Sequence, residues 1–296
     1  MGVMVPRSAP DGAGVPGTDT TTLPDATELA ELRRVAELVA GEAAAHLRTL
    51  PAPRETGAVG TKSTPTDVVT ESDRALERLV RDRLAELRPG EPVFGEEAAG
   101  DAGAARWVVD PIDGTVNYLY GLPWYAVSVA AVQDGVSLAG AVVEPASGRV
   151  WSAAAGAGAT CDGVPLRVTT ETDLAQSLVA CGFSYDARRR ERQAAMMAAL
   201  LPKVRDLRRT GSAALDLCGI AAGQLDAYVE HGINWWDWAA AALVAREAGA
   251  VVRVRPAPGR PRTDGDELGE DVTIAAAPGV AAAFEELLRE AGAADV

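Results

Sequence analysis

The chain has 296 residues, of which 48% are hydrophobic and 24% charged, and this length is sufficient for one large domain or two small ones with a sizeable core. Its net charge is −14, from 42 acidic and 28 basic residues, which argues against nucleic-acid binding through a broad basic face. No stretch approaches the roughly 18 consecutive apolar residues that a membrane helix needs. The N-terminus has no basic run followed by an apolar core, so we expect no secretory signal.

Cysteine and histidine are scarce. The three cysteines, Cys161, Cys181 and Cys218, are far apart and fit neither a zinc-binding spacing nor a complete disulfide framework. We therefore expect a reducing, cytoplasmic setting. With only His46 and His231 available, a metal site would have to rely on oxygen ligands, which suits magnesium, calcium or manganese.

The chain begins with a segment rich in small and polar residues, 1–24, which predicts a disordered tail. Apolar residues at helical spacing then predict a helix over 26–50 and a second one over 71–87, which Pro89-Gly90 ends.

Short apolar runs separated by turn residues follow. They predict strands over 107–109, 126–132, 138–143, 150–154 and 159–161. In the second half strands and helices alternate. Strands are expected over 178–182, 207–209, 227–230 and 251–254, and helices over 188–201, 213–222 and 237–248. A polar loop is expected over 256–270. This order predicts mixed sheets layered with helices.

Carboxylates occur at four places where predicted elements begin or end. They are Asp73 in the first turn of a helix, Glu96 and Glu97 after an apolar run, Asp110 and Asp113 after the strand 107–109, and Asp237 at the start of an alanine-rich helix. Each place also has a plainer interpretation, as turn chemistry, a solvated surface pair, a helix cap or a partner of the helix dipole.

The segment Asp110 to Thr115 is the most informative of the four. Pro111 favours an extended conformation at Asp110, so we expect Asp110 and Asp113 to project from one turn toward a shared point. Gly114 permits a close backbone approach, and Thr115 offers a hydroxyl at the start of a helix, where free N–H groups suit an anion. Two carboxylates beside such donors indicate metal ions that bridge a phosphate.

Four ordered motifs resemble the inositol monophosphatase family. They are Lys62 with Asp67-Val68-Val69-Thr70-Glu71-Ser72-Asp73, Gly95-Glu96-Glu97, the segment from Trp107 to Asn117, and the segment from Trp236 to Ala240. The resemblance implies an α/β fold, the layered αβαβα sandwich of the inositol monophosphatase and fructose-bisphosphatase type. It also implies an N-terminal α+β subdomain with the metal site over about 25–165, a C-terminal α/β subdomain over about 166–296, and a homodimer.

The resemblance further implies two to three Mg²⁺ ions and a role for each matching residue. Glu96, Asp110 and the Ile112 carbonyl would hold the first ion, Asp110, Asp113 and Asp237 the second, and Asp73 with Glu96 a weaker third. Gly114 and Thr115 would donate backbone N–H groups to phosphate, Glu230 would contact substrate hydroxyls, and Asp113, Ala213 and Asp237 would border the substrate. Thr115 with Glu96 would activate water, assisted by Asp73.

The function that this resemblance implies is magnesium-dependent, lithium-sensitive hydrolysis of a phosphate monoester of a small polyol. We expect myo-inositol 1-phosphate as the substrate and a metal-activated water as the nucleophile. The same chemistry on histidinol phosphate, fructose 1,6-bisphosphate or a nucleotide 3′-phosphate is an alternative, and so is a non-catalytic regulatory protein on this scaffold. We expect neither nucleic acid nor a membrane as a partner.

Overall fold

The computed structural model describes residues 24–50, 59–61, 68–98, 100–260 and 267–296. The predicted disordered tail lies outside the described residues except for Pro24, as do Lys62 and Asp67 of the first motif.

Two large sheets and one two-stranded sheet, β1 (Val59–Thr61) with β2 (Val68–Thr70), form the framework. The seven-stranded sheet contains, in spatial order, β3 (Val93–Gly95), β4 (Trp107–Asp113), β5 (Ala126–Gln133), β6 (Val136–Val143), β7 (Val150–Ala154), β8 (Ala159–Cys161) and β9 (Val164–Pro165). The five-stranded sheet contains β11 (Asp206–Arg208), β10 (Leu178–Cys181), β12 (Ala227–His231), β14 (Val272–Ala276) and β13 (Val251–Arg253). Only β3 runs parallel to its neighbour in the first sheet, and β10 runs parallel to both of its neighbours in the second.

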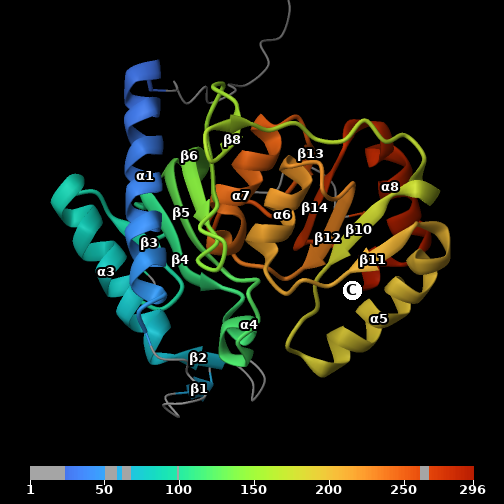
Figure 1. Ribbon diagram of the computed structural model, residues 1–296. Coiled ribbons are helices and arrows are strands. Elements are labelled where there is room, and N and C mark those ends of the chain that lie inside the picture. Colours follow the sequence, from blue (N-terminus) through green and yellow to red (C-terminus); the bar gives the residue numbers. More distant parts are fainter. Residues whose placement is uncertain (1–23, 51–58, 62–67, 99, 261–266) are drawn as a thin grey trace, which may run out of the picture.

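Seven α-helices of the described chain cover these sheets. They are α1 (Ala26–Leu47), α3 (Glu71–Leu87), α4 (Thr115–Tyr120), α5 (Ala187–Leu200), α6 (Ala213–Ala221), α7 (Trp235–Glu247) and α8 (Pro278–Glu290). Helices α1 and α3 cover one face of the seven-stranded sheet, α6 and α7 lie between the two sheets, and α5 and α8 cover the far face of the five-stranded sheet (Figure 1). Three apolar clusters fill the spaces between these layers. The predicted αβαβα sandwich is therefore confirmed.

The central hairpin shows why these residues form strands. Nearly all residues of β5 and β6 are buried, because helices cover both faces of the sheet, and such strands consist of continuous apolar runs. The turn between them contains Asp134 and Gly135 at φ of 49° and 72°, the left-handed conformation that a two-residue hairpin turn requires.

Most predicted elements are confirmed within two or three residues at their ends. The first helix ends at Leu47 rather than at residue 50, and α7 begins at Trp235. The expected end of a strand at Asp110-Pro111 is wrong, because β4 continues to Asp113. The structure also adds elements to those expected, of which the largest are β14 and α8.

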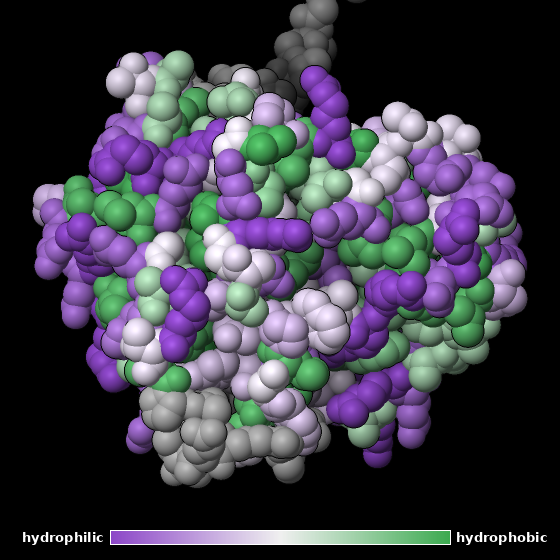
Figure 2. All heavy atoms as spheres, in the orientation of Figure 1, coloured by the Kyte–Doolittle hydropathy of each residue, from purple (hydrophilic) through white to green (hydrophobic). Residues whose placement is uncertain are grey.

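Hydrophilic and hydrophobic residues are interspersed over the face shown in Figure 2. Among the described residues, no helix combines the length and the apolar character that a bilayer crossing requires.

A candidate metal and substrate site

One extra residue in the pairing of β4 with β5 brings two carboxylates together. Asp110 is opposite Ser128 and Asp113 is opposite Ala126, so three steps along β4 match two steps along β5. Side chains three residues apart in a regular strand point to opposite faces, whereas a bulge of one residue returns the second side chain to the face of the first. Pro111, which has no N–H for the ladder, lies inside this irregular segment.

Helix α7 brings a third carboxylate to the same point. The helix packs closely on β6, since a Cβ at Gly140 would lie 2.9 Å from the Cα and Cβ atoms of Ala240. Asp237 is the third residue of α7, and its carboxylate accepts a hydrogen bond from the Asn234 N–H at 2.5 Å. The side chain interpreted as a possible helix cap therefore does contribute to capping, and it faces the strand carboxylates as well.

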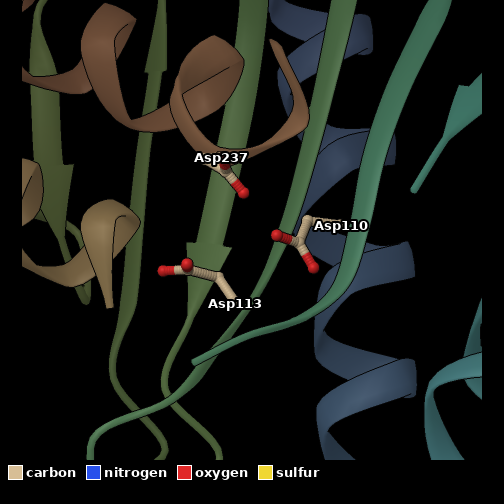
Figure 3. Close-up of side chains that lie close together, drawn as sticks. All are labelled: Asp110, Asp113 and Asp237. Carbon is tan, nitrogen blue, oxygen red and sulfur yellow. The ribbon is translucent and has the colours of Figure 1, made fainter. Parts of the chain in front are cut away.

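The ligand atoms of Asp110, Asp113 and Asp237 all lie within 4.8 Å of one another, and the three side chains lie close together (Figure 3). The pKa of Asp110 is raised, first by burial, next by the negative charge of Glu96, and then by the charges of Asp113 and Asp237. Burial and then the charge of Asp113 raise the pKa of Asp237. Ionising these groups together costs free energy, and a divalent cation between them would offset that cost.

Glu96 enters the cluster through the pairing of β3 with β4. These strands are parallel and Gly95 is opposite Val109, so Glu96 and Asp110 are the next residues along the two strands. After burial, the charge of Glu96 is the largest cause of the raised pKa of Asp110, and a hydrogen bond between the two carboxyl groups adds to it. Glu96 therefore lies beside Asp110 at the edge of the three-aspartate cluster.

Asp113 links the seven-stranded sheet to helix α6. Its Oδ2 accepts hydrogen bonds from the Ser212 hydroxyl and, at 2.8 Å, from the Ala214 N–H. Burial raises the pKa of Asp113 to about 6, and these two donors oppose part of the rise. The N-terminal end of α6 thus fixes the orientation of one carboxylate of the cluster.

The Thr115 hydroxyl lies between two acceptors, the Asp73 carboxylate at 3.1 Å and the Ile112 carbonyl at 3.0 Å. The Asp73 side chain is fully buried, and the Ile112 N–H donates to Asp110 at 3.0 Å. A hydroxyl has one proton and two lone pairs, so Thr115 can donate to one of these oxygens and still accept a hydrogen bond from a donor in the pocket.

Gly114 allows the segment after β4 to approach its neighbours closely. It precedes α4 with φ of 92°, and a Cβ there would lie 3.0 Å from the Trp124 carbonyl and 3.1 Å from the Gly211 carbonyl. The Asn117 amide donates to the Trp124 carbonyl at 2.7 Å and to the Thr210 carbonyl at 2.8 Å. Two loops from distant parts of the sequence are thereby joined at the edge of the cluster.

A pocket of about 550 Å³ opens over these groups. All the site residues predicted from the sequence, apart from Asp73 behind Thr115, line it: Glu96, Asp110, Ile112, Asp113, Gly114, Thr115, Ala213, Glu230 and Asp237. Sequence reasoning missed Tyr185, Arg209 and Trp236, which also line it. Two signals could have indicated them: Arg209 lies four residues before Ala213, which the resemblance places beside the substrate, and Trp236 begins the matched segment Trp236 to Ala240.

Glu230 faces the pocket from β12. Its carboxylate accepts a hydrogen bond from the Tyr228 hydroxyl at 2.8 Å. Burial raises the pKa of Glu230 to about 7, while Tyr228 and the charge of Arg209 oppose the rise. Gly182 leaves the space for this carboxylate, since a Cβ there would lie 1.8 Å from its Oε2 atom.

The donor set fits magnesium. It consists of carboxylate oxygens and the Ile112 carbonyl, which are the ligand types that hard divalent cations prefer. The one histidine of the pocket wall, His231, has its Nε2 atom 3.0 Å from the Leu268 carbonyl.

A family model described as the inositol monophosphatase family matches residues 28–291. A protein of Mycobacterium leprae named inositol-1-monophosphatase is 52% identical over 282 residues, covering 89% of this chain and 94% of that protein. A solved structure of Mycobacterium tuberculosis SuhB is 44% identical, covers 90% of this chain and 98% of its own, and has a TM-score of 0.74. A protein of Pasteurella multocida named Nus factor SuhB is 39% identical over 190 residues, covering 63% of this chain and 71% of that protein. The chain belongs to the inositol monophosphatase family, which is a family of phosphatases.

Proposed function

We propose that this enzyme hydrolyses phosphate monoesters of small polyols in the presence of Mg²⁺, and that myo-inositol 1-phosphate is its substrate. The observation that carries the proposal is the convergence of Asp110, Asp113 and Asp237 within 4.8 Å under one pocket. The name of the Mycobacterium leprae relative supports the choice of substrate.

The cation-binding roles follow the donor groups. Glu96, Asp110 and the Ile112 carbonyl would hold one Mg²⁺, and Asp110 would share a second with Asp113 and Asp237. Asp73 and Glu96 would hold a weaker third ion. Bound Mg²⁺ neutralises phosphoryl charge, lowers the pKa of water and stabilises the departing alcohol oxygen.

Thr115 and Glu96 would handle the proton of the attacking water. Because the Thr115 hydroxyl donates toward Asp73 or Ile112, its free lone pair can accept a hydrogen bond from water and so orient it. The Glu96 carboxylate would then remove the water proton as a general base.

Substrate recognition would use further groups of the pocket. The backbone N–H groups of Gly114 and Thr115 would donate to the phosphate. The Glu230 carboxylate would accept hydrogen bonds from hydroxyl groups of the polyol, and the small side chain of Ala213 would leave room for its ring.

Arg209 favours a second candidate, fructose 1,6-bisphosphate. It is exposed, lines the pocket, and has no ion-pair partner within the described chain. Its guanidinium lies 5.9 Å from the centre of the Phe183 ring, where a second phosphate group could meet it. The change Arg209→Met should then reduce kcat/KM for the bisphosphate about tenfold or more, the effect of losing one charged hydrogen bond, and spare inositol phosphate. Arg208→Met is the matched control, because Arg208 pairs with Asp206 at 2.7 Å.

The name Nus factor carried by a relative keeps a non-catalytic regulatory role as a rival. The retention of Glu96, Asp110, Asp113 and Asp237 in one pocket favours catalysis, because a decayed site has no need to keep four repelling carboxylates.

Phosphate release across inositol phosphate, histidinol phosphate, fructose bisphosphate and a nucleotide 3′-phosphate, with and without Mg²⁺, tests the proposal. We expect Mg²⁺-dependent release that is fastest with inositol phosphate. Lithium should inhibit it by replacing Mg²⁺ at the site of Asp110, Asp113 and Asp237. No release from any of these esters would contradict a phosphatase role and favour the regulatory one.

We also propose a homodimer. Tyr120, Leu122 and Trp124, at 57%, 42% and 50% exposure, form an apolar group at the end of α4 that a second copy could cover. Light scattering of the purified protein tests this, and a monomer at micromolar concentration would contradict it.

A further inference from the structure

A buried carboxylate outside the pocket holds the turn that carries Glu96. Glu77, on α3, is 1% exposed. Its Oε2 atom accepts a hydrogen bond from the Glu97 N–H at 2.6 Å, and its Oε1 atom accepts one from the Ala98 N–H at 3.0 Å. The two amides that follow Glu96 are thus held by one side chain.

The same carboxylate explains the glycine before Glu96. A Cβ at Gly95 would lie 2.6 Å from Oε1 and 2.9 Å from Oε2 of Glu77. Real Cβ atoms do not approach that closely, so the carboxylate occupies space that only glycine leaves open. The requirement comes from this contact, because Gly95 is not among the residues with positive φ.

Arg81 completes the arrangement one helical turn later. Its Nε atom donates to Glu77 at 2.8 Å, and its Nη1 atom donates to the Val93 carbonyl at 2.8 Å. Side chains four residues apart lie on one face of a helix, and this face of α3 also carries Asp73, which accepts from Thr115. One stripe of α3 therefore contacts β3, the turn after β3 and the Thr115 hydroxyl.

We propose that Glu77 is a positioning residue that sets the cation affinity of the site through Glu96. The proposal rests on the proposed metal-binding function. A charged acceptor that holds both amides fixes the backbone on which the Glu96 carboxylate is mounted, whereas a loose turn would let that carboxylate leave Asp110. Partners of this kind typically change metal affinity about 10- to 100-fold when they are mutated.

The test is Mg²⁺ binding to the metal-free protein, measured by calorimetry for wild type, Glu77→Gln and Glu86→Gln. In the Glu77→Gln protein an NH₂ group faces one of the two backbone N–H donors, so one of these hydrogen bonds is lost. We therefore expect the Mg²⁺ Kd of this variant to rise about tenfold. At saturating Mg²⁺, kcat should stay within about twofold of wild type, since every pocket side chain is still present and bound Mg²⁺ would hold the Glu96 carboxylate in place. Glu86→Gln, an isosteric change on the exposed part of α3, should leave the Kd unchanged.

A double mutant separates positioning from general stability. If Glu77 acts through Glu96, adding Glu77→Gln to Glu96→Gln should not weaken Mg²⁺ binding further. Amide hydrogen exchange at Glu97 and Ala98 should be faster in the Glu77→Gln protein even without metal. An unchanged Mg²⁺ Kd, or fully additive losses in the double mutant, would overturn the proposal.

Failure of a variant to fold and failure of the wild-type protein to bind Mg²⁺ have different meanings. If Glu77→Gln does not fold, Glu77→Asp is measured instead, and we expect the same rise in its Mg²⁺ Kd. If neither variant folds, Glu77 serves the fold alone, and the proposal is overturned. Wild-type protein that neither binds Mg²⁺ nor releases phosphate would instead contradict the proposed function itself.

Discussion

The Asp113 carboxylate on β4 accepts a hydrogen bond from the Ala214 N–H on α6 at 2.8 Å. This contact joins a strand of the seven-stranded sheet to a helix that lies between the two sheets. The orientation of a candidate metal ligand therefore depends on how the layers pack, and a change that separates them should weaken cation binding as well as the fold.

Asp110→Asn should abolish nearly all Mg²⁺-dependent phosphate release, by at least about 1,000-fold, because bound cations supply several kcal/mol of charge stabilisation. The metal-free variant should be as stable as wild type or more stable, since one of several repelling buried charges is gone. Phosphate release and thermal unfolding measure the two effects. Asp82→Asn, on the exposed face of α3, is the control, and near-normal turnover by Asp110→Asn would refute the ligand assignment.

Thr115→Val should lower kcat about 100-fold, the lower range for loss of a group that handles a proton. The change removes the hydroxyl that meets both Asp73 and Ile112, while the volume stays similar. Thr115→Ser keeps the hydroxyl and should retain most of the activity. Equal rates of the valine and serine variants at saturating Mg²⁺ would exclude the hydroxyl from the reaction.

Glu230 should make the metal-free protein less stable as pH rises. Its pKa is about 7 in the folded protein against an ordinary 4.5, so the folded state binds more protons between these values. The stabilisation is fully present below pH 4.5 and is lost as pH rises through 7. Allowing for the partial exposure of the side chain, the free energy of unfolding should fall by about 2 kcal/mol from this group.

Urea unfolding at pH 5.5 and pH 8 measures this change. Glu230→Gln keeps an acceptor for the Tyr228 hydroxyl but has no carboxylate, so its free energy of unfolding should fall less between the two pH values. The same fall in both proteins would show that Glu230 does not titrate in this range.

Gly182→Ala should displace the Glu230 carboxylate, because the new methyl group would lie 1.8 Å from it. We expect a loss of about 1 to 3 kcal/mol of stability from overpacking and a higher KM for inositol phosphate. Mg²⁺ binding should be unchanged. The control is Gly41→Ala, in α1, where nothing lies within 4 Å of the new methyl group. This change should be neutral or should stabilise the protein by up to about 1 kcal/mol. An unchanged KM in the Gly182→Ala protein would show that Glu230 does not contact the substrate.

Local sequence patterns predict much of the layered fold. The hairpin β5–β6 follows from two apolar runs around Asp134-Gly135, and the helix over 71–87 follows from its apolar spacing and Pro89-Gly90. The signal for α8 is also present, with Pro278 at its first position and Val280, Phe284 and Leu287 buried on one face, and it could have been recognised.

The candidate site is less local. Turn chemistry around Pro111 suggested the end of a strand, whereas the structure has an irregular strand that continues to Asp113, because a bulge depends on the partner strand as much as on its own residues. Glu77 looks like an ordinary helical surface acid until the turn after Gly95 is placed against it. Similarly, Arg209 belongs to the pocket only because β11 and the loop after it lie beside the cluster.

The most direct test of the metal site is a crystal structure of the protein grown with Mn²⁺ in place of Mg²⁺, with anomalous scattering used to locate the ions. We predict an anomalous peak within ligand distance of Asp110, Asp113 and Asp237, a second peak beside Glu96 and Asp110, and the loss of both in Asp110→Asn crystals. Peaks elsewhere, or an empty cluster in a protein that still hydrolyses its substrate with Mn²⁺, would contradict the account.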